Sequence, residues 1–242
     1  MVLAGKSIRF RDDACKVHAI RNKVIFVSAG INGFGPEANE VGNSWSAYDE
    51  PGKLAGQIPD TADDPVNFLA KLWGESVKQR LNRALLVNPD ATIRFWHKEG
   101  EQGLTTGVFA GLTKQGQFVI YKAALNCDCA GASRRAFLTI SPLPVPNRTA
   151  IAVIGTEEAQ ALYNELVEDR SERARASGEK FGADHAAMPR QELLGAAAVA
   201  SLEFILKYTQ ATDFGGPIDA VEMSSTGKVR WIQRKANCPD DR

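Results

Sequence analysis

Two cysteines separated by a single residue are the side chains in this sequence whose type and spacing most directly suggest chemistry. Cys127 and Cys129 form a C-x-C pair, and two thiolates hold a metal ion only together with ligands from elsewhere in the chain. The three histidines are scattered along the sequence and provide no adjoining ligands. We therefore expect no metal site and place both cysteines in a turn or at a strand end. An unrelated α/β enzyme with a reactive thiol at either position is one alternative.

Other catalytic and cofactor-binding motifs are missing from the sequence. No Ser-His-Asp or Cys-His-Asn arrangement can be supported by spacing. The glycine cluster at residues 30–35 has the wrong spacing for a dinucleotide-binding motif. The cluster also lacks the Lys-Ser/Thr end of a phosphate-binding loop. We expect no cofactor.

The composition is that of an ordinary globular protein. The chain has 242 residues, with 29 Lys+Arg against 29 Asp+Glu, so no overall charge indicates binding to nucleic acid or an anionic membrane. No signal peptide or membrane-spanning apolar run stands out, which predicts a cytoplasmic protein. In that compartment, we expect the four cysteines to be reduced. No linker or repeat is visible, so a single domain over residues 1–242 is the simplest organisation.

The amino-terminal part of the chain predicts strands followed by a helix. An apolar strand is expected within residues 2–7, and short strands at 7–10 and 15–20. A continuous apolar run at 23–28 is typical of a strand that is covered on both faces. Residues 35–62 are rich in glycine and proline and predict a loop, anchored by Trp45 and Tyr48. Asp64 and Pro65 are good residues to start a helix, which should end at Asn88-Pro89.

The rest of the chain predicts more strands, then helices, then a terminal hairpin. Expected strands cover 92–96, 105–112, 117–125, 136–140 and 149–154, with an edge or loop at the prolines of residues 142–146. Helices are expected from residue 156 to 166 and from Pro189 onward, with an exposed loop or frayed helix end over 169–188. A hairpin should cover 218–223 and 228–233. This order favours an α+β fold in which two sheets pack face to face between helices, an αββα sandwich.

Four segments, in order, resemble the proteasome β-subunit family of N-terminal nucleophile hydrolases. Residues 2–7 are similar to the family's apolar strand, residues 14–20 to the next strand with its lysine, and residues 24–30 to the strand that ends in Ala-Gly. Residues 215–221 resemble the family's late glycine turn and strand. The resemblance spans nearly the whole chain, with poor agreement at 35–60 and 125–150, and implies the four-layer αββα sandwich.

The resemblance also implies a reaction and two site residues. In this family an N-terminal Thr, Ser or Cys attacks an acyl carbon, and its own α-amine acts as the base. Lys16 matches the lysine that favours the neutral amine, and Gly30 matches the glycine whose N–H stabilises the oxyanion. Without the resemblance, Lys16 is an ordinary strand lysine and Gly30 a glycine required by a tight turn. Gly30 can serve as the oxyanion donor and as the glycine of a tight turn at the same time.

The sequence departs from the family pattern in two places. The family's aspartate falls at Lys6, where a second cation would repel Lys16 unless Asp12 or Asp13 intervenes. The nucleophile is expected before Met1, on a first strand that the sequence as given lacks. Ser7 and Thr61 are possible replacements, and neither is terminal.

Two functions follow from the resemblance. The first is a protein of the threonine-type peptidase or amidohydrolase class, inactive as given and acting on a peptide or small amide once a nucleophile is supplied. The second is a non-catalytic subunit that assembles with copies of itself. We expect a homo-oligomer in either case, with no nucleic-acid or membrane partner.

Overall fold

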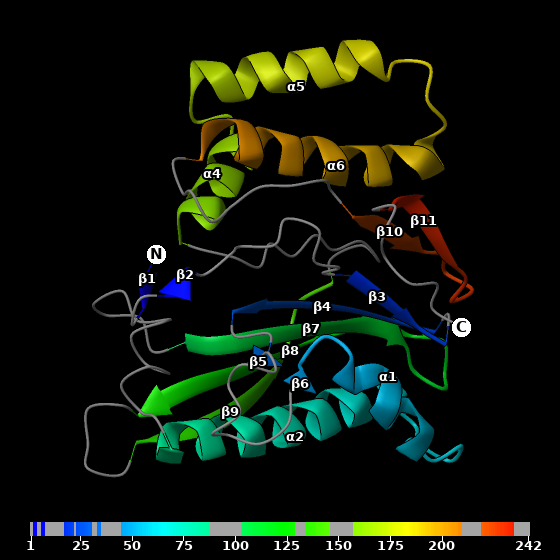
Figure 1. The fold of residues 1–242 in the computed structure, drawn as a ribbon. Helices are drawn as coiled ribbons and strands as arrows, with labels where there is room; N and C mark the ends of the chain where they lie inside the picture. Colours follow the sequence, from blue (N-terminus) through cyan, green and yellow to red (C-terminus); the bar gives the residue numbers. More distant parts are fainter. Residues whose placement is uncertain are drawn as a thin grey trace. The chain divides into compact units, whose positions relative to one another are not determined.

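A computed structural model describes residues 2–3, 6–7, 17–21, 23–30, 33–34, 45–87, 103–128, 134–145, 157–209 and 219–234 (Figure 1). These residues form a mixed α+β structure. The chain divides into two compact units, one of residues 1–15, 155–222 and 231–239, the other of residues 16–154, 223–230 and 240–242. The organisation of residues 1–242 as one domain stays a prediction. The expected strands at 92–96 and 149–154 lie outside the described residues.

The larger unit is built on a five-stranded antiparallel sheet in the order β3-β4-β7-β8-β9. Its strands are β3 (Val17–Ile20), β4 (Val24–Gly30), β7 (Gly103–Leu112), β8 (Phe118–Asp128) and β9 (Arg135–Pro142). The predicted hairpin of β7 and β8 is confirmed. It turns at Gly116, whose φ of 75° is in the left-handed region that glycine adopts without strain. Among the described strands, β9 is at an edge of the sheet and ends at Pro142, where the proline stretch predicted an edge or a loop.

The long helix α2 (Pro65–Val87) packs on β7, β8 and β9 (Figure 1). Its predicted start is confirmed: Asp64 precedes the helix, and its Oδ1 accepts a hydrogen bond from the Asn67 N–H at 2.9 Å. The other carboxylate oxygen of Asp64 accepts a hydrogen bond from the Tyr121 hydroxyl at 2.6 Å. One carboxylate therefore both caps α2 and attaches the start of the helix to β8.

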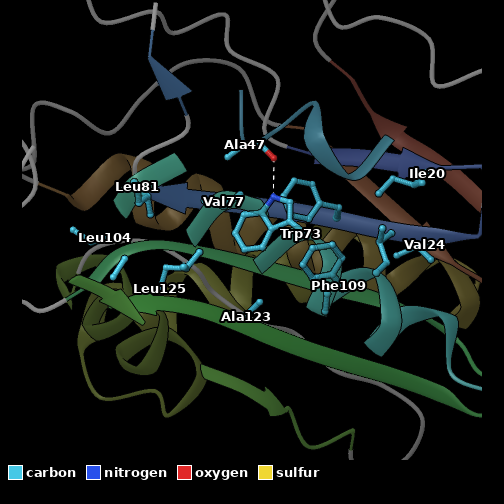
Figure 2. Packing of buried hydrophobic residues seen from close by; sticks show 14 of the residues in the cluster. Ile20, Val24, Ala47, Trp73, Val77, Leu81, Leu104, Phe109, Ala123 and Leu125 are labelled. Carbon is cyan, nitrogen blue, oxygen red and sulfur yellow. Dashed lines mark hydrogen bonds between the residues drawn. The ribbon is translucent and has the colours of Figure 1, made fainter. Parts of the chain in front are cut away.

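Three aromatic rings form the centre of the core between α2 and the sheet (Figure 2). Trp73 of α2 lies 5.5 Å from Phe26 and 5.6 Å from Phe109, and these two phenylalanines, paired across β4 and β7, lie 4.8 Å apart (ring centroids). The indole N–H donates to the carbonyl oxygen of Ala47 at 2.8 Å. Gly107 is required beneath the indole because a Cβ there would lie 2.8 Å from Trp73 Cζ3.

The sheet also buries residues on the face opposite to α2. Side chains alternate between faces along a strand, so residues out of phase with Phe26 and Phe109 point away from the helix. Four of these are buried: Val17, Ala19, Val108 and Ile120. Apolar side chains are thus buried on both faces of the sheet, although Ile25 and Val27 of β4, on the face away from α2, are only half-buried.

The segment predicted as a loop contains more regular structure than expected. The short strands β5 (Gly33–Phe34) and β6 (Trp45–Ser46) pair with each other, and α1 (Glu50–Leu54) leads into the 3₁₀ turn η2 (Ala55–Gln57). The loop prediction was wrong at 50–57 because Pro51 lies in the first turn of α1, where proline needs no N–H partner. Tyr48 does anchor this segment, since its hydroxyl donates to the Val17 carbonyl at 2.9 Å.

The smaller unit contains three packed helices and short strands. The helices are α4 (Glu157–Val167), α5 (Glu172–Asp184) and α6 (Arg190–Tyr208), and the strands are β1 (Val2–Leu3) and β2 (Lys6–Ser7). The terminal hairpin of β10 (Ala220–Met223) and β11 (Val229–Gln233) contributes residues to both units. The predictions of α4, α6 and the terminal hairpin are confirmed.

Two predictions in this unit were wrong. The expected apolar strand within residues 2–7 instead pairs with itself, with Val2 opposite Ser7. Residues 2–3 and 6–7 are therefore two paired strands and not one continuous strand. The expected loop at 169–188 contains α5, whose glycines at 178 and 182 obscured a segment of good helix formers.

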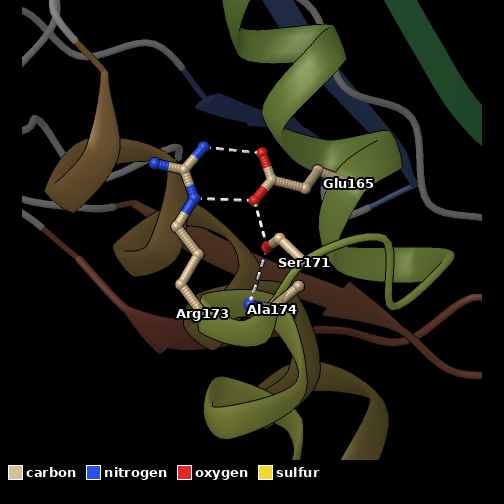
Figure 3. Close-up of polar contacts among 4 residues, drawn as sticks. All are labelled: Glu165, Ser171, Arg173 and Ala174. Atoms are coloured by element: carbon tan, nitrogen blue, oxygen red, sulfur yellow. Dashed lines mark hydrogen bonds and ion pairs between the residues drawn. The ribbon is translucent and has the colours of Figure 1, made fainter.

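A compact polar cluster joins α4 to the start of α5 (Figure 3). Ser171 is the N-cap of α5, accepting from the Ala174 N–H at 3.1 Å, and its hydroxyl donates to Glu165. Arg173 donates to both oxygens of the Glu165 carboxylate at 2.6 Å. These bonds lower the pKa of Glu165 from 4.5 to about 2, with the Arg173 bond as the largest cause and the Ser171 bond next.

Trp73→Ala should strongly destabilise the protein. The substitution empties the centre of the core and leaves the Ala47 carbonyl without its donor, so we expect a loss of about 3–5 kcal/mol. Leu86→Ala is the matched control on the same helix, because Leu86 is 84% exposed, and it should change stability by less than about 0.5 kcal/mol. Urea unfolding measures both. Equal losses of stability in the two variants would mean that the contacts of Trp73 do not hold α2 on the sheet.

Glu165 should contribute to stability in a defined pH range. Its pKa is depressed in the folded state, so its contribution is fully present above pH 4.5 and is lost as the pH falls toward 2. The wild type should therefore lose more unfolding free energy across this range than Glu165→Gln, and added salt should reduce the difference. Glu179→Gln, at an exposed position of α5, is the control and should follow the wild type. Parallel pH curves for wild type and Glu165→Gln would contradict the assignment.

Candidate functional site

The candidate site is the end of β4, where the apolar strand finishes at Ala29-Gly30. Gly30 is the last residue of β4 and pairs with Thr105 of β7. The strand lies between β3 and β7 and pairs antiparallel with both. The pairing with β3 covers Val24 to Val27, whereas the last three residues, up to Gly30, pair with β7 alone among the described strands.

Gly30 has a backbone conformation that only glycine adopts readily. Its φ is 96°, and a Cβ at this position would lie 2.6 Å from the Leu104 carbonyl oxygen and 2.8 Å from the Thr105 Cα. The pairing of β7 with β8 shifts register between Gly103 and Thr105, which makes Leu104 the extra residue of a bulge. The bulge thus lies directly against Gly30 and leaves no room for a Cβ at this position.

Two buried hydroxyl groups flank Gly30. Ser28 and Thr105 are only 4% and 3% exposed, although the rest of the buried core is almost entirely apolar. The Thr105 hydroxyl donates to the Ala29 carbonyl at 2.9 Å, so it fixes the peptide that leads into Gly30. The sequence predictions missed both residues. Ser28 could have been found as the hydroxyl residue at the end of the apolar run at 23–28. Nothing in the sequence around Thr105 indicates that it is buried.

The second predicted site residue, Lys16, lies outside the described residues, so its relation to Gly30 stays a prediction. The next residue, Val17, is the first of β3 and pairs with Val27 of β4. The start of β3 is fixed from outside the sheet by the Tyr48 bond to the Val17 carbonyl, and the Tyr48 ring stacks on His18 at 5.1 Å. The chain that follows Lys16 is therefore rigidly held beside β4.

The Asp64 carboxylate, which lies at the start of α2, changes the pKa of the Tyr121 hydroxyl on β8. The hydrogen bond to the Asp64 carboxylate, helped by burial, raises the pKa of the Tyr121 hydroxyl to about 12. The phenol therefore stays protonated and keeps its donor role at neutral pH. The hydrogen bond of this pair positions the start of α2 against β8.

The prediction that the cysteines are reduced was wrong for Cys127, which is disulfide-bonded. A sulfur in a disulfide is neither a thiolate ligand nor a nucleophile, so the C-x-C metal pair and the reactive thiol at this position are both excluded. The other three cysteines lie outside the described residues. Within the described ranges, no three His, Cys, Asp or Glu side chains gather as a metal site, and no helix is long and apolar enough to cross a membrane.

Comparisons with protein-family models, with curated proteins and with solved structures find no match to this chain.

Gly30→Ala should be more harmful than the same change at Gly116. Both glycines have positive φ, which costs alanine about 1–2 kcal/mol. Gly116 has no atom within 4 Å of the new Cβ, whereas at Gly30 the Leu104 carbonyl must move. We expect Gly30→Ala to lose at least about 3 kcal/mol, because overpacking adds to the backbone cost. Chemical denaturation of both variants measures the difference, and equal losses would show that β7 yields freely at the bulge.

Proposed function

We propose that this chain is a proteasome-subunit-like protein of the N-terminal nucleophile hydrolase class, with Lys16 and Gly30 at its reaction site. The observation that carries the proposal is the end of β4. Four features coincide there: a buried strand, an Ala-Gly end, a left-handed glycine, and a neighbouring strand that begins just after a lysine. In the family that the sequence resembles, these features surround the nucleophile.

We further propose the four-layer αββα sandwich as the architecture. Two observations support it. The five-stranded sheet buries side chains on both faces, including Phe109 on the α2 face and Val108 on the other. The chain order of strands, helix, strands, helices and strands supplies the elements for a second sheet and a second helical layer.

The proposed reaction is hydrolysis of a peptide or small amide. An N-terminal Thr, Ser or Cys attacks the acyl carbon while its α-amine accepts the hydroxyl or thiol proton. The Lys16 ammonium lowers the proton affinity of that amine, and the Gly30 N–H donates to the oxyanion. The protonated α-amine gives its proton to the leaving amine as the amide C–N bond breaks, which leaves an acyl-enzyme. Water then hydrolyses the acyl-enzyme to the carboxylic acid and frees the nucleophile. The chemistry requires a nucleophile with a free α-amine ahead of β1 (Val2–Leu3).

A chain extended by a first strand that starts with threonine tests this proposal. The extension is released from a cleavable leader, so that the threonine amine is free, and hydrolysis of fluorogenic peptide amides is measured. We expect activity that disappears when the threonine is replaced by alanine. Lys16→Ala should lower it by at least about a hundredfold, because it removes the group that tunes the base. Lys122→Ala, an exposed lysine on β8, is the control and should leave it unchanged.

Absence of hydrolysis by the folded, threonine-extended chain would contradict the hydrolase proposal. The second candidate is then a non-catalytic subunit that assembles with its own copies. One observation favours it: the Leu104 carbonyl explains Gly30 without any oxyanion role. An oligomer without hydrolysis supports this candidate, and a monomer rejects it.

A further inference from the structure

The outer edge of β9 is partly covered by a side chain from α2. Asn82 Oδ1 accepts a hydrogen bond from the Ala136 N–H at 2.7 Å, and its Nδ2 donates to the Ala136 carbonyl at 3.5 Å. The amide of Asn82 thus pairs with Ala136 as the backbone of a neighbouring strand would. Such a cover hides one position of an edge that could otherwise pair with another chain.

The contact also shows which residues of β9 have outward-facing backbone groups. The N–H and C=O of one residue in an antiparallel strand point to the same side, and the side alternates along the strand. Ala136 faces outward, and the register with β8 continues without a shift from Arg135 to Pro142. Leu138 and Ile140 therefore also face outward. Leu143 faces inward, in agreement, because its N–H donates to the Ile120 carbonyl at 2.9 Å.

The open part of this edge is short and has defined ends. Among the described residues, no strand pairs with the outer side of β9 and no side chain bonds to the outward groups of Leu138 or Ile140. Asn82 closes one end at Ala136. Pro142 closes the other end because proline has no N–H to donate. Within the described part of the chain, Leu138 and Ile140 are therefore the two positions of this edge that remain for pairing.

We propose that this edge pairs with β9 of a second copy of the chain, antiparallel, about a two-fold axis at Thr139. In this register Leu138 of each copy exchanges hydrogen bonds with Ile140 of the other, so that both open positions are used in both copies. Thr139 faces Thr139 of the second copy, and Phe137 faces Ser141 of the second copy. Phe137, which is 43% exposed in the single chain, gains cover.

The charges on β9 favour this antiparallel arrangement. Arg134 and Arg135 lie at one end of the strand, and both are exposed. An antiparallel two-fold axis places the arginines of the two copies at opposite ends of the shared edge. Parallel pairing would place them side by side, and like charges directly opposite each other are destabilising. Because Asn82 and Pro142 close the two ends, pairing is limited to the segment from Leu138 to Ile140. This segment can pair with the same segment of a second copy. This proposal does not depend on hydrolase activity.

Charge substitutions at Thr139 test both the partner and the register. Thr139 is exposed, so the fold should tolerate a charge there. Thr139→Lys places two ammonium groups opposite each other, Thr139→Glu places two carboxylates, and each should raise the dimer dissociation constant by about fivefold or more. An equimolar mixture of the two variants should recover association, because opposite charges then meet. The same charges at Gln115, exposed in the turn between β7 and β8, are the control.

Sedimentation velocity over a concentration series gives the readout. Weakening in both Thr139 variants with recovery in the mixture supports the proposal. Three outcomes overturn it: a wild type that stays monomeric at the highest concentration reached, variants that associate as well as the wild type, or a mixture that does not recover. A wild-type monomer that binds an extended foreign peptide at this edge would instead assign the edge to another partner.

Discussion

The packing of Trp73 against Phe26 and Phe109 is the interaction on which the larger unit depends. These rings come from three elements that are distant in sequence, and their burial holds α2 against the middle of the sheet. Gly107 allows the indole to approach the sheet, and the Ala47 carbonyl accepts its N–H. The segment before α2 is therefore attached to the same cluster. The Asp64 carboxylate then fixes the start of the helix to β8.

The same packing determines the geometry at the end of β4. Because β4 and β7 are held in register by the core, the bulge at Leu104 meets Gly30 and excludes any side chain there. The Thr105 hydroxyl fixes the adjoining peptide. A backbone held this firmly suits an oxyanion donor, because a preorganised N–H needs no rearrangement during reaction. It also suits a purely structural strand end, which is why a kinetic experiment must separate the two functions.

Prediction from sequence was most successful where the signal is local and periodic. The hairpin of β7 and β8 was predicted from two strand-like runs joined by a short turn, and Asp64-Pro65 identified the start of α2. It was wrong where proline and glycine suggested irregular structure. Pro51 lies inside α1, and glycines lie inside α5, whose N-cap Ser171 is supported by Glu165. Glu165 lies six residues before Ser171 on the preceding helix, and the contact depends on how α4 and α5 pack.

The sequence alone determined the α+β class, the strands of the central sheet and the glycine at position 30. Those features follow from side-chain periodicity and from conformational preferences that act over a few residues. Only the tertiary structure decided that Leu104 occupies the space beside Gly30, that Ser28 and Thr105 are buried, and that Asn82 covers part of β9. These contacts join residues up to 76 positions apart. They depend on strand register and on helix placement, which no local pattern encodes.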